Sequence, residues 1–234
     1  MSEGPQSVAD SAEAMREHWR TFAREDPRFY IASNRQEWSD ADFYADGAGL
    51  AASVLEWAAP LGDERMLELG CGAGRMLVHL AKGFERADGV DIAPEMIAAA
   101  ADAPLPDNVH LAVNSGLDLG DFADGSFDFV FSLMVFQHIP DPEVVAVYLS
   151  EIGRVLRPDA KAVLHFDTRE VSVGRRIAMQ LPDRVLPRTR RRFIRRHPLD
   201  SAWVREQLAI AGLRIADERD PDSAVHFVLC ERTG

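Results

Sequence analysis

The sequence is poor in cysteine, in long apolar runs and in positive charge. Its two cysteines, Cys71 and Cys230, give neither a metal-ligand spacing nor a disulfide framework. No apolar run approaches the ~20 residues that span a bilayer, and the polar first residues lack a signal-peptide pattern. The net charge of -12 disfavours broad, nonspecific binding to nucleic acid. We therefore expect a cytoplasmic protein without a membrane span, and 234 residues suffice for one sizeable core.

A glycine loop between two short apolar strands is the most informative motif. Residues 67–75 read LELGCGAGR, whereas the dinucleotide fingerprint G-x-G-x-x-G would need glycine in place of Arg75. Glu68 adds a carboxylate, which favours a cationic ligand over a pyrophosphate. A second strand ends at Asp91, whose carboxylate can accept hydrogen bonds from both ribose hydroxyls. The motif thus predicts a site for a nucleoside cofactor.

Strands and helices alternate along the chain, which predicts an α/β fold with a mostly parallel sheet. We expect strands at 65–69, 86–91, 109–113, 127–132 and 160–167, and a final hairpin at 214–217 and 225–230. We expect helices at 8–25, 47–59, 74–82, 94–101, 141–156 and 200–211. Residues 1–60 would form a helical N-terminal cap of the same domain, and 61–234 the cofactor-binding part with an insertion at 171–199.

These motifs resemble those of the class I S-adenosylmethionine-dependent methyltransferases. The pattern E-x-G-x-G-x-G precedes an acidic second strand, and GSFDFVFS at 125–132 is similar to the family's fourth-strand motif. The resemblance extends from about Trp38 through Asp167. It implies a Rossmann-like, seven-stranded sheet with a C-terminal antiparallel hairpin and a helical insertion after strand five. It also implies an enzyme that uses S-adenosylmethionine, releases S-adenosylhomocysteine and methylates a small molecule, with a hydroxyl favoured as the acceptor.

The resemblance assigns a set of cofactor-binding residues. They are Glu68, Gly70, Gly72, Gly74, Asp91, Ile92, Met96, Ser115, Gly116 and Leu133. The glycines would line the methionine portion, and Asp91 would hold the ribose. Met96 can equally be a core residue, because methionine commonly fills an apolar helix face. Where the family often has an acid after the third strand, this chain has Asn114 and Ser115, so an amide, a hydroxyl or a backbone carbonyl would accept from the adenine amino group.

His138 is the candidate catalytic base, because it follows the fourth strand and the pKa of an unperturbed histidine suits proton removal near neutrality. The alternative is a structural role in capping the next helix or packing against the cofactor. His165 lies on an apolar strand and is expected to be a core residue. The histidines and acids form no convincing metal-binding pattern, so we expect no catalytic metal.

Aromatic residues are concentrated near the N-terminus, and arginines in the insertion. The aromatics are Trp19, Phe22, Phe29, Tyr30, Trp38, Phe43 and Tyr44, which would form either a lid over the site or a packed cap, with Tyr30 and Tyr44 able to offer hydroxyls to a pocket. The arginines would select an anionic or carrier-linked acceptor, or else form a solvated face. Two other functions stay open: an RNA methyltransferase that grips phosphates with these arginines, and a noncatalytic cofactor-binding module.

Overall fold

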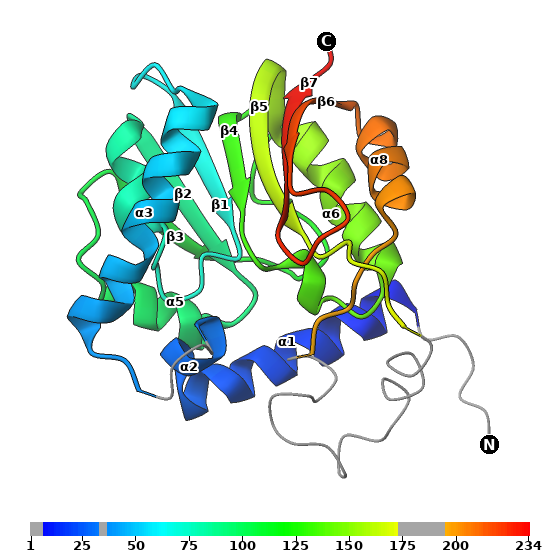
Figure 1. The fold of residues 1–234 in the computed structure, drawn as a ribbon. Helices are drawn as coiled ribbons and strands as arrows, with labels where there is room; N and C mark the ends of the chain where they lie inside the picture. Colours follow the sequence, from blue (N-terminus) through cyan, green and yellow to red (C-terminus); the bar gives the residue numbers. More distant parts are fainter. Residues whose placement is uncertain (1–6, 33–36, 173–194) are drawn as a thin grey trace, which may run out of the picture.

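The protein is built around a seven-stranded sheet with the strand order β3-β2-β1-β4-β5-β7-β6 (Figure 1). The computed structural model describes residues 7–32, 37–172 and 195–234. The strands are β1 Arg65–Leu69, β2 Arg86–Asp91, β3 Val109–Val113, β4 Phe127–Ser132, β5 Leu156–Phe166, β6 Leu213–Arg219 and β7 His226–Arg232. Strands β1 to β5 pair in parallel, and β7 is antiparallel to both β5 and β6. The predicted fold class is confirmed.

The strand order reverses between β1 and β4, which is where an open parallel sheet leaves a crevice at its carboxyl edge. The helices are α1 Val8–Glu25, α2 Pro27–Ile31, α3 Asp40–Ala58, α4 Leu77–Leu80, α5 Pro94–Ala101, α6 Pro142–Val155 and α8 Ser201–Ile210. Short 3-10 turns, η1 Ala81–Gly83 and η2 Phe136–His138, complete the described elements. Helices α1 and α2 run beneath the carboxyl edge of the sheet (Figure 1).

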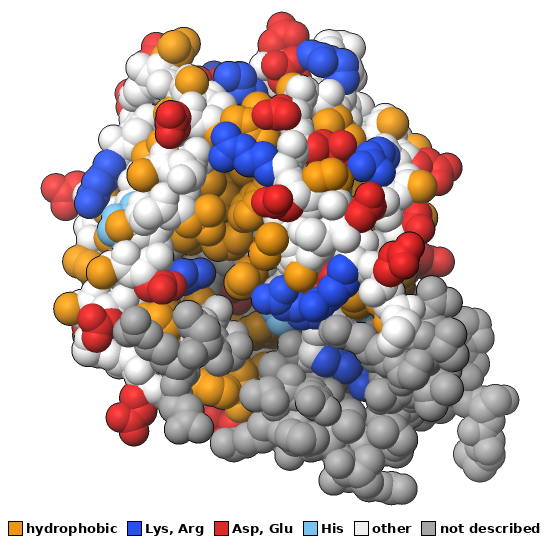
Figure 2. All heavy atoms as spheres, in the orientation of Figure 1, with side chains coloured by type: hydrophobic (Ala, Val, Ile, Leu, Met, Phe, Trp, Pro, Cys, Tyr) orange, Lys and Arg blue, Asp and Glu red, His pale blue; other side chains and the backbone are white. Residues whose placement is uncertain are grey.

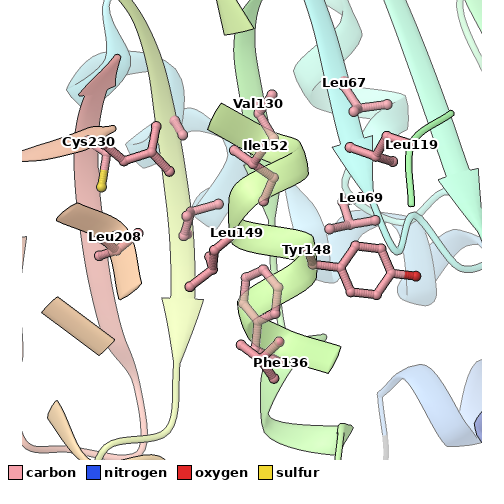
Figure 3. Close-up of a cluster of buried hydrophobic side chains, with 14 of the residues drawn as sticks. Leu67, Leu69, Leu119, Val130, Phe136, Tyr148, Leu149, Ile152, Leu208 and Cys230 are labelled. Atoms are coloured by element: carbon pink, nitrogen blue, oxygen red, sulfur yellow. The ribbon is translucent and has the colours of Figure 1, made fainter. Parts of the chain in front are cut away.

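Alternating side chains of the central strands pack against different helices, as the two-residue period of a strand requires. On one face, Phe129 and Phe131 of β4 join a cluster with residues of α3 and α4. On the other face, Val130 packs with residues of α6 and α8. Figure 3 shows this second cluster, in which Tyr148 and Ile152 of α6 lie among the strand side chains. Both faces of the central sheet are therefore buried.

Side-chain hydrogen bonds cap the N-termini of the first two helices, and ion pairs hold α1 against α5. Ser7 and Asp10 form a capping box at the start of α1, and the Asp26 carboxylate accepts from two backbone N–H groups at the start of α2. Arg20 and Arg24 of α1 both bind Glu95 of α5. Because α1 also packs against α6, it bridges the two sides of the crevice. The proposed division at residue 60 stays a prediction.

Some element boundaries differ from the sequence prediction. The helix expected at 74–82 shortens to α4 and η1, because the glycine loop continues in turns through Met76. Helix α3 begins at Asp40 rather than 47, since Ser39 caps it there. Strand β5 begins at Leu156, which already pairs with Phe127 of β4. Within the described residues, no helix is long and apolar enough to cross a membrane.

Most of the expected insertion lies outside the described residues. That part includes Arg175, Arg176, Asp183, Arg184, Arg188, Arg190, Arg191 and Arg192. The structure does describe Arg195 and Arg196, which precede α8.

Candidate functional site

A pocket opens at the carboxyl ends of β1, β2 and β4, the position expected for a ligand in this type of sheet. Its walls come from the β1–α4 loop, the ends of β2 and β3, the β4–α6 connection, and helices α1, α2 and α6. The lining residues are Met15, Trp19, Tyr30, Ile31, Glu68, Leu69, Gly70, Cys71, Gly72, Arg75, Met76, Asp91, Ile92, Met96, Asn114, Leu133, Met134, Val135, His138, Ile139 and Tyr148.

The β1–α4 loop approaches its neighbours more closely than side chains would permit. Gly70 has a φ of 73°, and a Cβ there would lie 2.2 Å from Cγ2 of Val135. Gly72 has a φ of 52°, and its Cβ would lie 2.7 Å from Cδ1 of Ile31. Both positions favour glycine for conformational reasons as well. The loop thus fits tightly between the β4–α6 connection and α2.

Asp91 organises the far side of this loop. One carboxylate oxygen accepts from the backbone N–H of Gly72 at 3.0 Å, and the other accepts from the N–H of Ala93 at 3.0 Å. Burial raises the pKa of Asp91 to about 6, against the lowering effect of these backbone donors. The carboxylate is held rigidly, and its remaining lone pairs can accept from a ligand.

Glu68 contributes a second carboxyl group, which is buried and only 3% exposed. Its Oε2 atom is buried and has no hydrogen-bond partner in the described part of the chain. Burial raises the pKa of Glu68 to about 8, with Arg75 lowering it and Asp91 raising it. Arg75 cannot fully neutralise Glu68, since its Nη1 is 2.7 Å from Asp46. A cationic ligand would stabilise the ionised carboxylate in this environment.

The end of β3 offers an amide rather than an acid. The Nδ2 of Asn114 donates to the Tyr148 hydroxyl at 3.0 Å, while its buried Oδ1 has no partner among the described residues. Ser115 and Gly116, which the family resemblance selected, do not line the pocket. Ser115 instead closes a local turn with Asp118 through a 2.8 Å hydrogen bond. Asn114 is therefore the group at this strand end that can accept from a ligand.

Comparison with known proteins agrees with this geometry. The family model described as "Methyltransferase domain" matches residues 67–164. Residues 67–164 therefore carry a methyltransferase domain.

Among curated relatives of this methyltransferase domain, a ubiquinone biosynthesis O-methyltransferase of Xanthomonas oryzae is 31% identical over 106 residues. That match covers 44% of this chain and 43% of the relative, so the chain spans less than half of the relative's length. A 2-methyl-6-phytyl-1,4-hydroquinone methyltransferase of Synechocystis is 36% identical over 95 residues, 40% of this chain and 29% of that protein.

Solved structures share the fold over nearly the whole chain. Magnesium protoporphyrin IX methyltransferase from Synechocystis, solved with bound SAH (S-adenosylhomocysteine), superposes with a TM-score of 0.66 at 19% identity. The superposition covers 94% of this chain and 99% of that one.

The remaining residues assigned from the methyltransferase family divide into two groups. Ile92, Met96 and Leu133 line the pocket as expected. Gly74 does not line it; a Cβ there would meet Leu105, Ala103 and Ala100 at 3.4 to 3.7 Å. Gly74 therefore shapes the loop from outside the pocket.

His138 lines the same pocket from η2, in the β4–α6 connection. Its Nε2 is 3.1 Å from the Gln137 side-chain amide, and its ring makes an edge contact with Trp19 at 5.7 Å between centroids. The Gln137 Oε1 is buried without a partner in the described chain. Exchanging the two amide atoms would let Oε1 accept from Nε2–H, which fixes the histidine tautomer and leaves Nδ1 as the basic nitrogen.

The connection after β4 carries backbone strain. Met134 lines the pocket with a φ of 58°, a conformation that costs of order 1–3 kcal/mol in a non-glycine residue. Strain of this kind persists where surrounding structure fixes the backbone, and it is common at functional sites.

The tyrosine hydroxyls expected at the pocket are directed elsewhere. Tyr30 lines the pocket but donates its hydroxyl to Glu25 at 2.6 Å, and the Tyr44 hydroxyl donates to the Ala73 carbonyl at 3.5 Å. His165 is fully buried, and burial lowers its pKa to about 4, so it is a neutral core residue.

Among the described residues, no group of three His, Cys, Asp or Glu side chains could hold a metal ion.

Proposed function

We propose that this protein transfers a methyl group from S-adenosylmethionine to a hydroxyl of a small-molecule acceptor. One observation carries the proposal: a single pocket of the methyltransferase domain gathers the carboxyl groups of Glu68 and Asp91, the unpartnered amide oxygen of Asn114 and the histidine His138. The name of the Xanthomonas relative, an O-methyltransferase, supports oxygen as the acceptor atom.

The side chains present suit S-adenosylmethionine. The Glu68 carboxyl, whose Oε2 has no partner among the described residues, would face the cationic methionine portion beside Gly70 and Gly72. Asp91, fixed by two backbone donors, would accept from the ribose hydroxyls. The unpartnered Asn114 oxygen would accept from the adenine amino group, which makes it a better candidate than Ser115 or Gly116.

An apolar pair would hold the adenine ring. Ile92 and the buried Met96 line the pocket between Asp91 and the end of β3. Met96 also packs with Ala23 and Ala93, so its core role and its proposed contact with the ring are compatible.

When bound, the cofactor supplies an electrophilic methyl group on a sulfonium sulfur. The chain's own contribution is to align the acceptor and exclude water, and alignment of two bound reactants can supply ~7–11 kcal/mol. Trp19 and Met15 of α1 and Ile31 of α2 close the pocket from below. His138 would accept the acceptor's hydroxyl proton at Nδ1, with Gln137 holding the ring through Nε2.

Calorimetric titration with S-adenosylmethionine and S-adenosylhomocysteine tests the cofactor assignment, with NADH as the control. We expect both sulfur compounds to bind, Asp91→Ala to lose both, and NADH not to bind. Preference for NADH would overturn the proposal. Methyl transfer to a panel of phenols then tests catalysis. Tight cofactor binding with no transfer to any small molecule or RNA would support a noncatalytic module instead.

A further inference from the structure

The basic residues at the end of β5 form a second feature of the site, on the side away from the cofactor carboxyl groups. Residues 195–199 cross this region in two backbone hydrogen bonds. The N–H of His197 donates to the Gln137 carbonyl at 2.7 Å, and the N–H of Leu199 donates to the Asp167 carbonyl at 2.8 Å. Gln137 directly precedes His138, so the segment is fastened one residue from the candidate base.

One buried acid contacts an arginine of this segment and an arginine that follows β5. The side chain of Asp167 is 0% exposed, and its Oδ2 is 2.6 Å from Nη2 of Arg169 and 4.0 Å from Nη1 of Arg196. Two guanidinium groups therefore share one carboxylate, and Arg195 directly precedes Arg196 in the chain. The nearby acid Glu218 is already engaged by Arg205 and His226.

Several guanidinium N–H groups here are buried without hydrogen bonds. Within the described residues, the Nε and Nη1 of Arg195 and the Nε of Arg169 have no partner. Buried donors are nearly always paired in folded proteins, and an unpaired buried donor is costly. Figure 2 shows basic side chains gathered at the lower centre of this face, beside a histidine. In a chain with a net charge of -12, such local positive excess is a specific arrangement.

We propose that Arg195 and Arg169 bind an anionic group, a carboxylate or phosphate, on the methyl acceptor. Planar guanidinium groups match the oxygens of such anions in paired, charge-assisted hydrogen bonds. This inference rests on the proposed methyl transfer and names the acceptor class: a hydroxylated acid rather than a neutral phenol or alcohol. The acceptor's hydroxyl would lie toward His138, and its anion toward the segment 195–199.

The experiment uses the full chain saturated with S-adenosylhomocysteine, titrated with matched pairs of probes. The pairs are 4-hydroxybenzoate with 4-hydroxybenzamide, and 4-hydroxycinnamate with its amide; 4-hydroxyphenyl phosphate and inorganic phosphate test the alternative anion. We expect an acid to bind about tenfold or more tightly than its amide. Arg195→Gln should remove this preference, and Arg169→Gln should reduce it. Tighter binding of the phosphate ester would assign the anion as phosphate.

Arg157→Gln is the matched control, because Arg157 is 53% exposed at the start of β5, at the other edge of the sheet. Affinity for S-adenosylhomocysteine should be unchanged in all three variants, which shows that the fold and cofactor site are intact. Equal binding of acids and amides, absence of saturable binding by every anion, or an acid preference that survives Arg195→Gln would overturn the inference. Failure of the unmodified protein to bind S-adenosylhomocysteine would instead overturn the proposed function.

Discussion

Glu68 should make cofactor binding depend on pH. Burial raises the pKa of this carboxyl to about 8, so it is mostly protonated at neutral pH in the free protein. A bound ligand cation stabilises the carboxylate and lowers its pKa. Binding at neutral pH must therefore release a proton from Glu68, and affinity must rise with pH up to about 8.

The size of the effect follows from the ionised fraction of Glu68. With a pKa of about 8, roughly 1% is ionised at pH 6 and half at pH 8, so affinity should rise about fifty-fold, or ~2.3 kcal/mol. The window begins at the pKa of Asp91, about 6, where Asp91 is already half ionised, so Asp91 adds only about a factor of two and Glu68 dominates the change. At pH 7, about 0.9 proton should be released per ligand bound.

Calorimetry of S-adenosylhomocysteine binding measures the affinity at each pH. Repeating it in buffers of different ionisation enthalpy measures the number of protons released per ligand bound. Glu68→Gln is the matched variant, because it keeps the shape of the side chain and cannot ionise. We expect its affinity to change by no more than about twofold across this window, through Asp91, and its proton release at pH 7 to fall to about 0.1 or less. A flat affinity profile for the unmodified protein, with no proton release, would refute the reasoning.

The same buried carboxyl affects the stability of the free protein. Its pKa is higher in the folded than in the unfolded chain, so its stabilising contribution is present below the unfolded value near 4.5 and is lost as pH rises through about 8. Glu68→Gln should therefore raise the melting temperature of the free protein at about pH 9, by a few degrees for each kcal/mol that the substitution adds to the free energy of unfolding. It should change the melting temperature little near pH 5. A destabilised variant at the higher pH would contradict this account.

Three further predictions concern the loop, the base and the N-terminal helices. Gly70→Ala should destabilise the fold by about 2–4 kcal/mol, and Val135→Ala should restore part of that loss in the double variant, as followed by urea unfolding. His138→Ala should lower kcat by about 10²–10⁴ while S-adenosylhomocysteine affinity stays within about twofold; an unchanged methylation rate would exclude a base. Glu95→Gln, which breaks the ion pairs between α1 and α5, should speed ligand release several-fold in stopped-flow fluorescence with little change in melting temperature, because exposed pairs contribute about 0–1 kcal/mol each.

The sequence predicts the strands of the sheet better than the β1–α4 loop. Strands β1 to β4 have the predicted boundaries, because short apolar runs bounded by loop residues indicate buried parallel strands. The helix expected from Gly74 fails to start there, because hydrogen bonds from Gly70 and Cys71 to the Val90 carbonyl hold the loop against β2. That contact joins segments about twenty residues apart, and local periodicity carries no signal for it.

Asn114 shows why parts of the site also escape prediction. Its side chain is fixed by the hydroxyl of Tyr148, which comes from α6, 34 positions along the chain. The sequence alone leaves Asn114 and Ser115 as equal candidates, whereas the structure uses Ser115 in a turn and leaves the Asn114 oxygen in the pocket. The placement of the arginines near Asp167 likewise depends on backbone bonds between distant segments.

The two sides of the site differ in which buried polar atoms have no hydrogen-bond partner. Around β1 and β3, the unpartnered atoms include the oxygens of Glu68 and Asn114 together with one donor, the Nε of Arg75; beyond β5, they include the donors of Arg195 and Arg169. Unsatisfied buried groups of opposite character cost stability in the free protein, and each favours a ligand of the complementary kind. A cationic methyl donor on the first side and an anionic acceptor on the second would satisfy both. His138 lies in the β4–α6 connection, next to Gln137, whose carbonyl accepts from His197, and the acceptor's hydroxyl proton would be removed there.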